Sequence, residues 1–322
     1  MNKTSITTTA RKHLFHFLVC IIFISIRSTS AENQTFIFLR TDVSARAAGI
    51  GGGFTTMQND INAMFYNPAT LGTLTTSQAS FGYYSLLMDV SAGSAAYGQM
   101  IEDFGMVGAG VRFVNYGDFI KTDENGVAID QFSALDVAFN VGAAYQLEER
   151  LFFGGNVRFI SSSIETYSSS GIAIDFGTHY TLGNNRTALA FTINNFGTQF
   201  SSYITTKEPL PLDVKFAVSH RPERLPVTLN LSFHRLNDAR DGFSSRLNAF
   251  SLGGEFKIGN YVRARFGYNN QRRQDLKIGS GIGLAGFSMG FGVVYDEFTF
   301  DYTTSLYGTV GSLSFITVGM KL

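Results

Sequence analysis

A cluster of four glycines is the first feature of this sequence whose residue types suggest chemistry. Its members lie within five positions of the stretch ARAAGIGGGF and are Gly49, Gly51, Gly52 and Gly53. A dinucleotide-binding loop needs a third glycine at a fixed spacing, and a P-loop needs a Lys-Ser or Lys-Thr pair. The third position holds Phe54 or Thr56, and no such pair follows. The spacing argues against a phosphate site and favours glycines that let the backbone turn tightly and approach its surroundings closely.

The other reactive residue types form no catalytic or metal-binding pattern. The histidines beyond the N-terminal region are His179, His220 and His234, and none has a partner at metal-ligand spacing. The serine-rich stretch 161–170 lacks a nucleophile motif and is interpreted as a solvated loop. The stretch TDENG, 122–126, lacks the full spacing of a calcium loop and is interpreted as a turn. We therefore predict no catalytic residue, no cofactor and no metal.

The N-terminus has the organisation of a secretory leader. Basic residues precede an apolar run, 14–26, and small residues end at Ala31. We predict a signal peptide over 1–31, with a membrane anchor as the alternative. The only cysteine, Cys20, lies inside this leader, so disulfides and cysteine chemistry are excluded from the mature chain. The net charge is zero and no basic stripe with interleaved aromatic residues is present, which argues against nucleic-acid binding.

From about residue 76 the sequence alternates between apolar and polar residues, as in VTLNLSFH, 227–234. This period of two is typical of strands with one apolar and one polar face. The predicted strands are 76–86, 90–101, 105–116, 131–146, 150–163, 169–181, 186–197, 212–220, 226–236, 246–257, 261–269, 284–295, 297–306 and 311–322. Tight turns after the even-numbered strands alternate with longer polar loops after most odd-numbered ones. The pattern predicts an all-β transmembrane fold, an antiparallel outer-membrane barrel of about fourteen strands over 76–322.

Polar residues on one face of these strands are predicted to line the lumen. They are Asp136, Asn140, Asp175, His179, Asp213, Lys215, Asn230, His234 and Asp301. A basic residue facing lipid at the bilayer midplane costs about 2–4 kcal/mol, and an acidic one somewhat less. The polar face must therefore point inward.

Residues 32–75 alternate poorly and contain too much glycine for barrel strands. The stretch MQNDINAMFYNPATLG predicts one short helical turn, capped by Asn59 or Asp60 and stopped by Pro68. The segment is long enough to fold inside a lumen. We therefore predict that 32–75 forms a hatch inside the barrel.

The stretches GIGGGF and NDINAMFYNPATLG, followed by fourteen strands, resemble the FadL-like outer-membrane proteins. The resemblance implies that the glycine cluster and Asn67, Pro68 and Ala69 form the motif of the hatch. The chain is more closely similar to the PorV/PorQ family, and within it to the PorQ branch. The stretches that carry this resemblance are VSARAAGIGGG, NPATL, NYGDFIKTDENG, FSALDVAF, SIETYSSSGIAIDFG and LPLDVKFAVSH. The hatch departs from the family pattern in its extra glycine and in Thr70 after the alanine.

The resemblance implies a non-enzymatic component of the type IX secretion system. Such a protein sits in the outer membrane of a Gram-negative bacterium, among lipids and lipopolysaccharide. Its expected partners are surface-complex proteins of the PorV, PorU and PorZ type, which process exported cargo and anchor it to lipopolysaccharide. The alternative is a FadL-like transporter of hydrophobic molecules, which needs an apolar pocket or lateral opening next to the hatch. A lipase-like or protease-like outer-membrane enzyme is the third hypothesis, with no motif in its favour.

Overall fold

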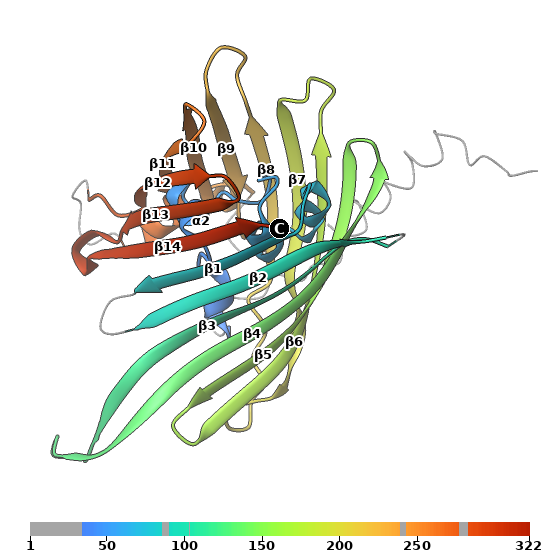
Figure 1. Ribbon diagram of the computed structural model, residues 1–322. Coiled ribbons are helices and arrows are strands. Elements are labelled where there is room, and N and C mark those ends of the chain that lie inside the picture. The colour runs from blue at the N-terminus through green and yellow to red at the C-terminus, as the bar shows by residue number, and fades with distance from the viewer. Residues whose placement is uncertain (1–33, 86–89, 103, 239–242, 277–282) are drawn as a thin grey trace, which may run out of the picture.

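The computed structural model describes residues 34–85, 90–102, 104–238, 243–276 and 283–322, and shows a closed antiparallel β-barrel (Figure 1). Each strand pairs with its sequence neighbours, and β1 pairs with β14 to close the ring. The predicted barrel fold is confirmed, with a hatch inside it. The predicted signal peptide, 1–31, lies outside the described residues.

All fourteen strands lie at the predicted places. They are β1 Gln78–Ser85, β2 Ser91–Ile101, β3 Gly105–Thr122, β4 Ala128–Glu148, β5 Leu151–Ile164, β6 Tyr167–Thr181, β7 Thr187–Ser201, β8 Asp213–His220, β9 Val227–Phe233, β10 Phe250–Ile258, β11 Val262–Asn269, β12 Phe287–Tyr295, β13 Phe298–Leu306 and β14 Ser312–Lys321. The even-numbered strands up to β12 end in turns of two to six residues. In this fold such turns face the periplasm, so we name this the periplasmic end and the opposite one the outer end.

The alternation of side chains along each strand gives the wall a polar face towards the lumen and an apolar face towards the membrane. On β5, Asn156 and Arg158 are buried inside, whereas Val157 and Phe159 are exposed on the membrane side. A strand places successive side chains on opposite faces, so one polar and one apolar surface result. Among the described helices, none is both long and apolar enough to cross a membrane.

The prediction of a long loop between the third and fourth strands is wrong, because both strands continue through this region. β3 and β4 pair beyond a bulge between Asn115 and Asp118 and end in a turn at Asp123 and Gly126 (Figure 1). Asp123 Oδ1 accepts the backbone N–H groups of Asn125 and Val127, each at 2.9 Å. The segment TDENG is therefore a turn, as predicted, at the tip of a long hairpin.

The serine-rich stretch 161–170 is also not a solvated loop. β5 and β6 pair through Ser161–Ser170, Ser162–Ser169 and Ser163–Ser168, and only residues 165 and 166 form the turn. Glu165 adopts a left-handed conformation there, with φ 54°. The ninth strand is shorter than predicted. It ends at Phe233, because Arg235 has a left-handed backbone with φ 54°. His234 therefore lies just beyond β9.

The hatch lies inside the barrel and contains four short helices. They are η2 (Ile37–Arg40), α2 (Ala45–Gly49), η3 (Ile61–Phe65) and η4 (Pro68–Thr73). Two buried apolar clusters hold it. One includes Phe38 and packs on Tyr84 and Phe315 near the outer end, and the other includes Met64 and packs on Ala144 nearer the periplasmic end. The described hatch thus runs along the lumen towards the periplasmic end before it enters β1. Three further short helices occupy connections at the outer end: α3 (Phe243–Arg246), α4 (Asn270–Asp275) and η5 (Gly308–Val310).

Candidate functional site

The Asn-Pro-Ala motif begins η4 and touches the barrel wall. Asn67 caps the helix, since its Oδ1 accepts the Ala69 N–H at 3.0 Å, and Pro68 occupies the first helical position. Proline fits there because the first N–H groups of a helix have no helical partner. Asn67 Nδ2 donates to Thr55 O at 2.9 Å within the hatch and to Thr178 O of β6 at 3.1 Å. Asparagine thus joins the motif to the wall.

Two wall glycines make room for this motif. A Cβ atom at Gly154 would lie 2.4 Å from Ala69 N and from Pro68 C, and one at Gly177 would lie 2.0 Å from Asn67 Oδ1. Real Cβ atoms essentially never approach so closely, so β5 and β6 can contact the motif only with glycine at these positions. The hatch backbone and the wall backbone are therefore in direct contact.

An apolar groove of about 720 Å³ lies on the membrane side of this same part of the wall. Its lining includes Phe104, Ala143, Tyr145, Phe153, Gly155, Phe176, Thr178, Phe191 and Ile193. Tyr145 is 63% exposed and Phe176 is 54% exposed, which places the groove on the outside of the barrel. At its floor, a Cβ atom on Gly155 would have Asp175 O, at 3.7 Å, as its nearest neighbour. The missing side chain of Gly155 thus helps to form the groove.

The glycine cluster ends α2 and packs against the opposite wall. Gly51 and Gly52 have φ values of 71° and 81°, which favour glycine, and they follow the end of the helix. Gly49 and Gly53 are close-packed instead: a Cβ on Gly49 would lie 2.8 Å from Thr303 Oγ1, and one on Gly53 would lie 3.2 Å from Ser251 Oγ. The predicted role of the cluster, tight turning and close approach, matches this geometry.

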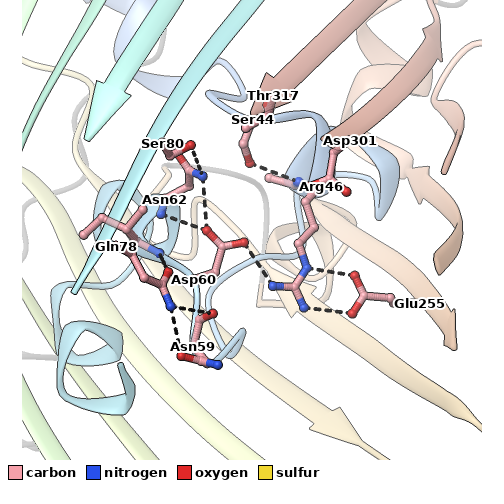
Figure 2. Close-up of polar contacts among 12 residues, drawn as sticks. Ser44, Arg46, Asn59, Asp60, Asn62, Gln78, Ser80, Glu255, Asp301 and Thr317 are labelled. Carbon is pink, nitrogen blue, oxygen red and sulfur yellow. Dashed lines mark hydrogen bonds and ion pairs between the residues drawn. The ribbon is translucent and has the colours of Figure 1, made fainter. Parts of the chain in front are cut away.

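Arg46 of α2 ties the hatch to the wall through a buried ionic network (Figure 2). Its Nε and Nη2 atoms donate to the two carboxylate oxygens of Glu255 on β10, both at 2.8 Å, and Nη1 pairs with Asp60 at 3.0 Å. Arg265 of β11 donates to Glu255 at 2.7 Å and to Asp301 at 2.6 Å. Two arginines therefore share three carboxylates, and Glu255 bridges them. Bidentate pairs of this kind fix orientation as well as adding energy.

Neutral side chains next to this network hold the hatch to β1 (Figure 2). Asp60 caps η3 by accepting the Asn62 N–H at 2.9 Å, and Asn62 Nδ2 donates to Ser80 Oγ at 2.9 Å. Gln78 accepts the Ile61 N–H at 3.1 Å. Of the two predicted caps, Asp60 is therefore the one that caps η3.

Arg112 of β3 and Asp42 hold the outer half of the hatch. Arg112 donates to the carbonyl oxygens of Leu39 and Thr41 at 3.1 and 3.0 Å, at the end of η2. Asp42 pairs with Arg272 of α4 at 3.1 Å and accepts the Tyr66 hydroxyl at 3.2 Å. Burial, together with the Asp42 carboxylate, raises the pKa of Tyr66 well above its usual value, so the hydroxyl keeps its proton.

The predicted lumen residues lie inside the barrel but do not form one site. Asp136 accepts from Tyr116 and Ser162, and Asp175 pairs with Arg158 at 2.8 Å. His179 lies 3.2 Å from Gln58 of the hatch, and His234 hydrogen-bonds to Ser251 at 2.8 Å. Asp213 pairs with Lys215 at 3.4 Å, and Asp301 belongs to the ionic network. Asn140 accepts from Arg158 Nε at 3.0 Å, and Asn230 from Thr56 at 3.3 Å. In the part of the chain that the structure describes, no three His, Cys, Asp or Glu side chains are placed to hold a metal ion.

The lumen residues that the sequence analysis does not predict are the buried arginines and Glu255. Arg112, Arg158 and Arg265 are at most 2% exposed. Each sits between apolar neighbours on a predicted strand, as in VRF at 111–113 and 157–159. The alternation that selected Asp136 therefore places these arginines inward as well. The same rule identifies them as lumen residues, although it does not predict their partners.

Comparison with known proteins places the fold among outer-membrane barrels. No protein-family model and no curated protein matches the chain. The Pseudomonas putida toluene transporter TodX matches with 14% identity over 91% of this chain and 97% of its own, at a TM-score of 0.57. A deltaS2 mutant of the TodX monoaromatic hydrocarbon channel matches at 16% identity, over 87% and 98%, with a TM-score of 0.57. A Pseudomonas aeruginosa FadL homologue matches at 10% identity, over 87% and 98%, with a TM-score of 0.53. At these identities the likeness is one of fold: the chain forms a barrel of the FadL type.

Proposed function

We propose that this chain is a transporter of small hydrophobic molecules in the outer membrane of a Gram-negative bacterium, exported with removal of residues 1–31. The lumen is filled by the hatch, so the route that suits an apolar molecule begins at the wall and not at an open pore. This function needs an apolar pocket beside the hatch, and the groove at Gly155 supplies one. The proposal also draws on the fold shared with a toluene transporter.

One observation carries the proposal: the apolar groove and the hatch motif lie on opposite sides of the same strip of wall. Thr178 lines the groove, and its carbonyl oxygen accepts the hydrogen bond from Asn67. Gly154 and Gly177 leave only backbone between the groove and the motif. A molecule in the groove would therefore lie one strand thickness from the hatch. The volume of the groove, about 720 Å³, suits a small ligand, since ligand pockets typically span about 300–1,000 Å³.

The test fills the groove without touching the hatch. Gly155→Leu places a side chain in the groove, because a Cβ there meets nothing closer than 3.7 Å. Gly254→Leu is the matched control: its Cβ has its nearest neighbours at 3.5 and 3.8 Å among membrane-side residues of β9 and β10, away from the groove. We expect Gly155→Leu to reduce uptake of radiolabelled toluene to that of cells without the barrel, and Gly254→Leu to leave it unchanged. Wild-type uptake no higher than that of empty cells would refute the proposal.

A second candidate function is favoured by the sealed lumen. The hatch is tied to the wall near one end by Arg46 and near the other by Arg112. A plug fixed in this way suits a static scaffold, as does the sequence resemblance to the PorQ branch of the PorV/PorQ family. In this role the chain would support a type IX surface attachment complex, with PorV-, PorU- and PorZ-type proteins and lipopolysaccharide as its neighbours.

Affinity purification from native outer membrane separates the two candidates. A scaffold is expected to co-purify with surface-complex proteins in fixed ratio and to retain them in Gly155→Leu. A barrel that purifies alone under mild detergent would rule out the scaffold role and leave the transporter unaffected.

A further inference from the structure

A polar cavity of about 430 Å³ lies at the periplasmic mouth of the barrel, with the hatch as its floor. The hatch contributes Gln58 to Asn62, and the ends of the strands form the rim. Seven basic and four acidic side chains line the cavity. Three of the four acids, Asp60, Glu255 and Asp301, are already paired with Arg46 or Arg265. The excess positive charge therefore lies at the rim.

Four of the rim cations come from neighbouring strand ends and form what we name the basic arc. They are Arg186 before β7, Arg221 after β8, Lys257 on β10 and Arg263 on β11. Among the ion pairs of the described residues, none includes Arg221, Lys257 or Arg263. Arg186 pairs with Glu223, whose side chain is 68% exposed, and an exposed pair of this kind contributes little and exchanges readily. Arg263 donates to the backbone oxygens of Asn260 and Val262, which carry no net charge, so the cluster keeps its excess positive charge and favours an anion.

The spread of the basic arc decides between a single anion and an extended one. β7 to β11 are consecutive in the sheet. Adjacent strands lie about 4.8 Å apart, so the arc spans roughly 20 Å. One phosphate or carboxylate cannot reach across that distance. An extended peptide covers it with about six residues. The cations face the lumen and not the lipid, which also argues against lipid headgroups as the occupant.

We propose that the basic arc binds an acidic, extended segment of a periplasmic protein. The segment would lie across the mouth, with its carboxylates on Arg221, Lys257 and Arg263, and would contact the hatch at Gln58 and Asn59. This interaction is independent of transport through the groove, which lies on the outer surface of the wall. It gives the barrel a docking surface for a partner on its periplasmic side.

Binding of a fluorescent hexaglutamate peptide to the full barrel in nanodiscs tests this proposal, with hexaglutamine as the uncharged control. We expect saturable binding of hexaglutamate at low ionic strength, weakening as salt is added, and none of hexaglutamine. The double variant Arg221→Gln, Lys257→Gln should weaken binding by about tenfold, the effect of losing two partly exposed charge pairs. The matched control is Arg150→Gln, Arg224→Gln, which removes the same charge from periplasmic turns outside the cavity.

Three results would overturn the proposal. The first is the absence of saturable hexaglutamate binding by the wild-type barrel. The second is equal weakening in the two double variants, which would show an effect of net charge and not of a site. The third is displacement of hexaglutamate by an equimolar amount of inorganic phosphate, which would show a site for one small anion.

Discussion

Gly154→Ala adds one methyl group to the wall at the point where it touches the hatch motif. The new Cβ would lie 2.4 Å from Ala69 N and Pro68 C, and 2.6 Å from Pro68 O. These are backbone atoms, which cannot rotate away as a side chain can. Ordinary contact begins near 3.4 Å, so the hatch and β5 must separate by about 1 Å. The neighbouring Gly155→Ala is the control, since its Cβ faces the membrane with the nearest atom at 3.7 Å.

The cost of that separation has two parts. Forcing extra volume into a packed interior costs about 1–3 kcal/mol. A shift of the motif also stretches both hydrogen bonds that Asn67 Nδ2 donates. These bonds are 3.1 Å long to Thr178 O and 2.9 Å long to Thr55 O. Each such bond contributes about 0.5–1.5 kcal/mol. We therefore expect Gly154→Ala to lower the free energy of unfolding by about 2–6 kcal/mol, and Gly155→Ala to change it by less than about 0.5 kcal/mol.

Guanidinium unfolding of the barrel in lipid vesicles measures the difference. The chain contains no tryptophan, so far-ultraviolet circular dichroism and gel mobility are suitable signals. Trypsin provides a second readout, because Arg46 of hatch helix α2 is held by its ion pairs with Glu255 and Asp60 and becomes cleavable when the hatch loosens. Equal unfolding midpoints and equal cleavage rates for Gly154→Ala and Gly155→Ala would refute direct contact between wall and motif.

Two further substitutions test the polar contacts of the hatch. Glu255→Gln removes the charge shared by Arg46 and Arg265. Breaking a buried ionic contact should lower the free energy of unfolding by about 3–5 kcal/mol, which is measured as a lower guanidinium midpoint. An unchanged midpoint would contradict the bridging role. Tyr66→Phe removes the oxygen that accepts the Val43 N–H at 3.0 Å, and the unpaired buried donor should cost about 1–3 kcal/mol. Faster hydrogen exchange at the Val43 amide is the expected sign, and exchange as slow as in the wild type would contradict it.

The sequence predicted the strands well where lipid constrains them and poorly where it does not. Inside the bilayer a polar residue facing lipid is costly, so β5 and β9 must alternate and are easily recognised. The tips of β3 and β4 project beyond that constraint, and most of residues 118–133 are exposed. Polar residues there look the same in a hairpin as in a loop. The serine stretch 161–170 likewise pairs as strands without a sequence pattern that distinguishes it from a loop.

The candidate site was predictable by residue type but not by partner. Asn67-Pro68-Ala69 and the glycine cluster stand out in the sequence. Their partners lie far away along the chain: Asn67 and Thr178 are separated by 111 positions. The groove depends on Gly155 facing lipid while Gly154 faces the hatch, a distinction that one residue of register would reverse. Only the three-dimensional pairing supplies that information.

The hatch also bridges the seam at which the barrel closes. Ala45 N donates to Thr317 Oγ1 on β14 at 2.8 Å, while Asn62 donates to Ser80 on β1, the partner strand across the seam. The first and last strands of the ring are thus held by one stretch of the hatch, residues 45–62, which precedes β1 along the chain. In the folded barrel this segment acts as a clamp on the seam, because it is bonded to β14 and to β1 at the same time. The plug is therefore part of the closure of the ring as well as the filling of its lumen.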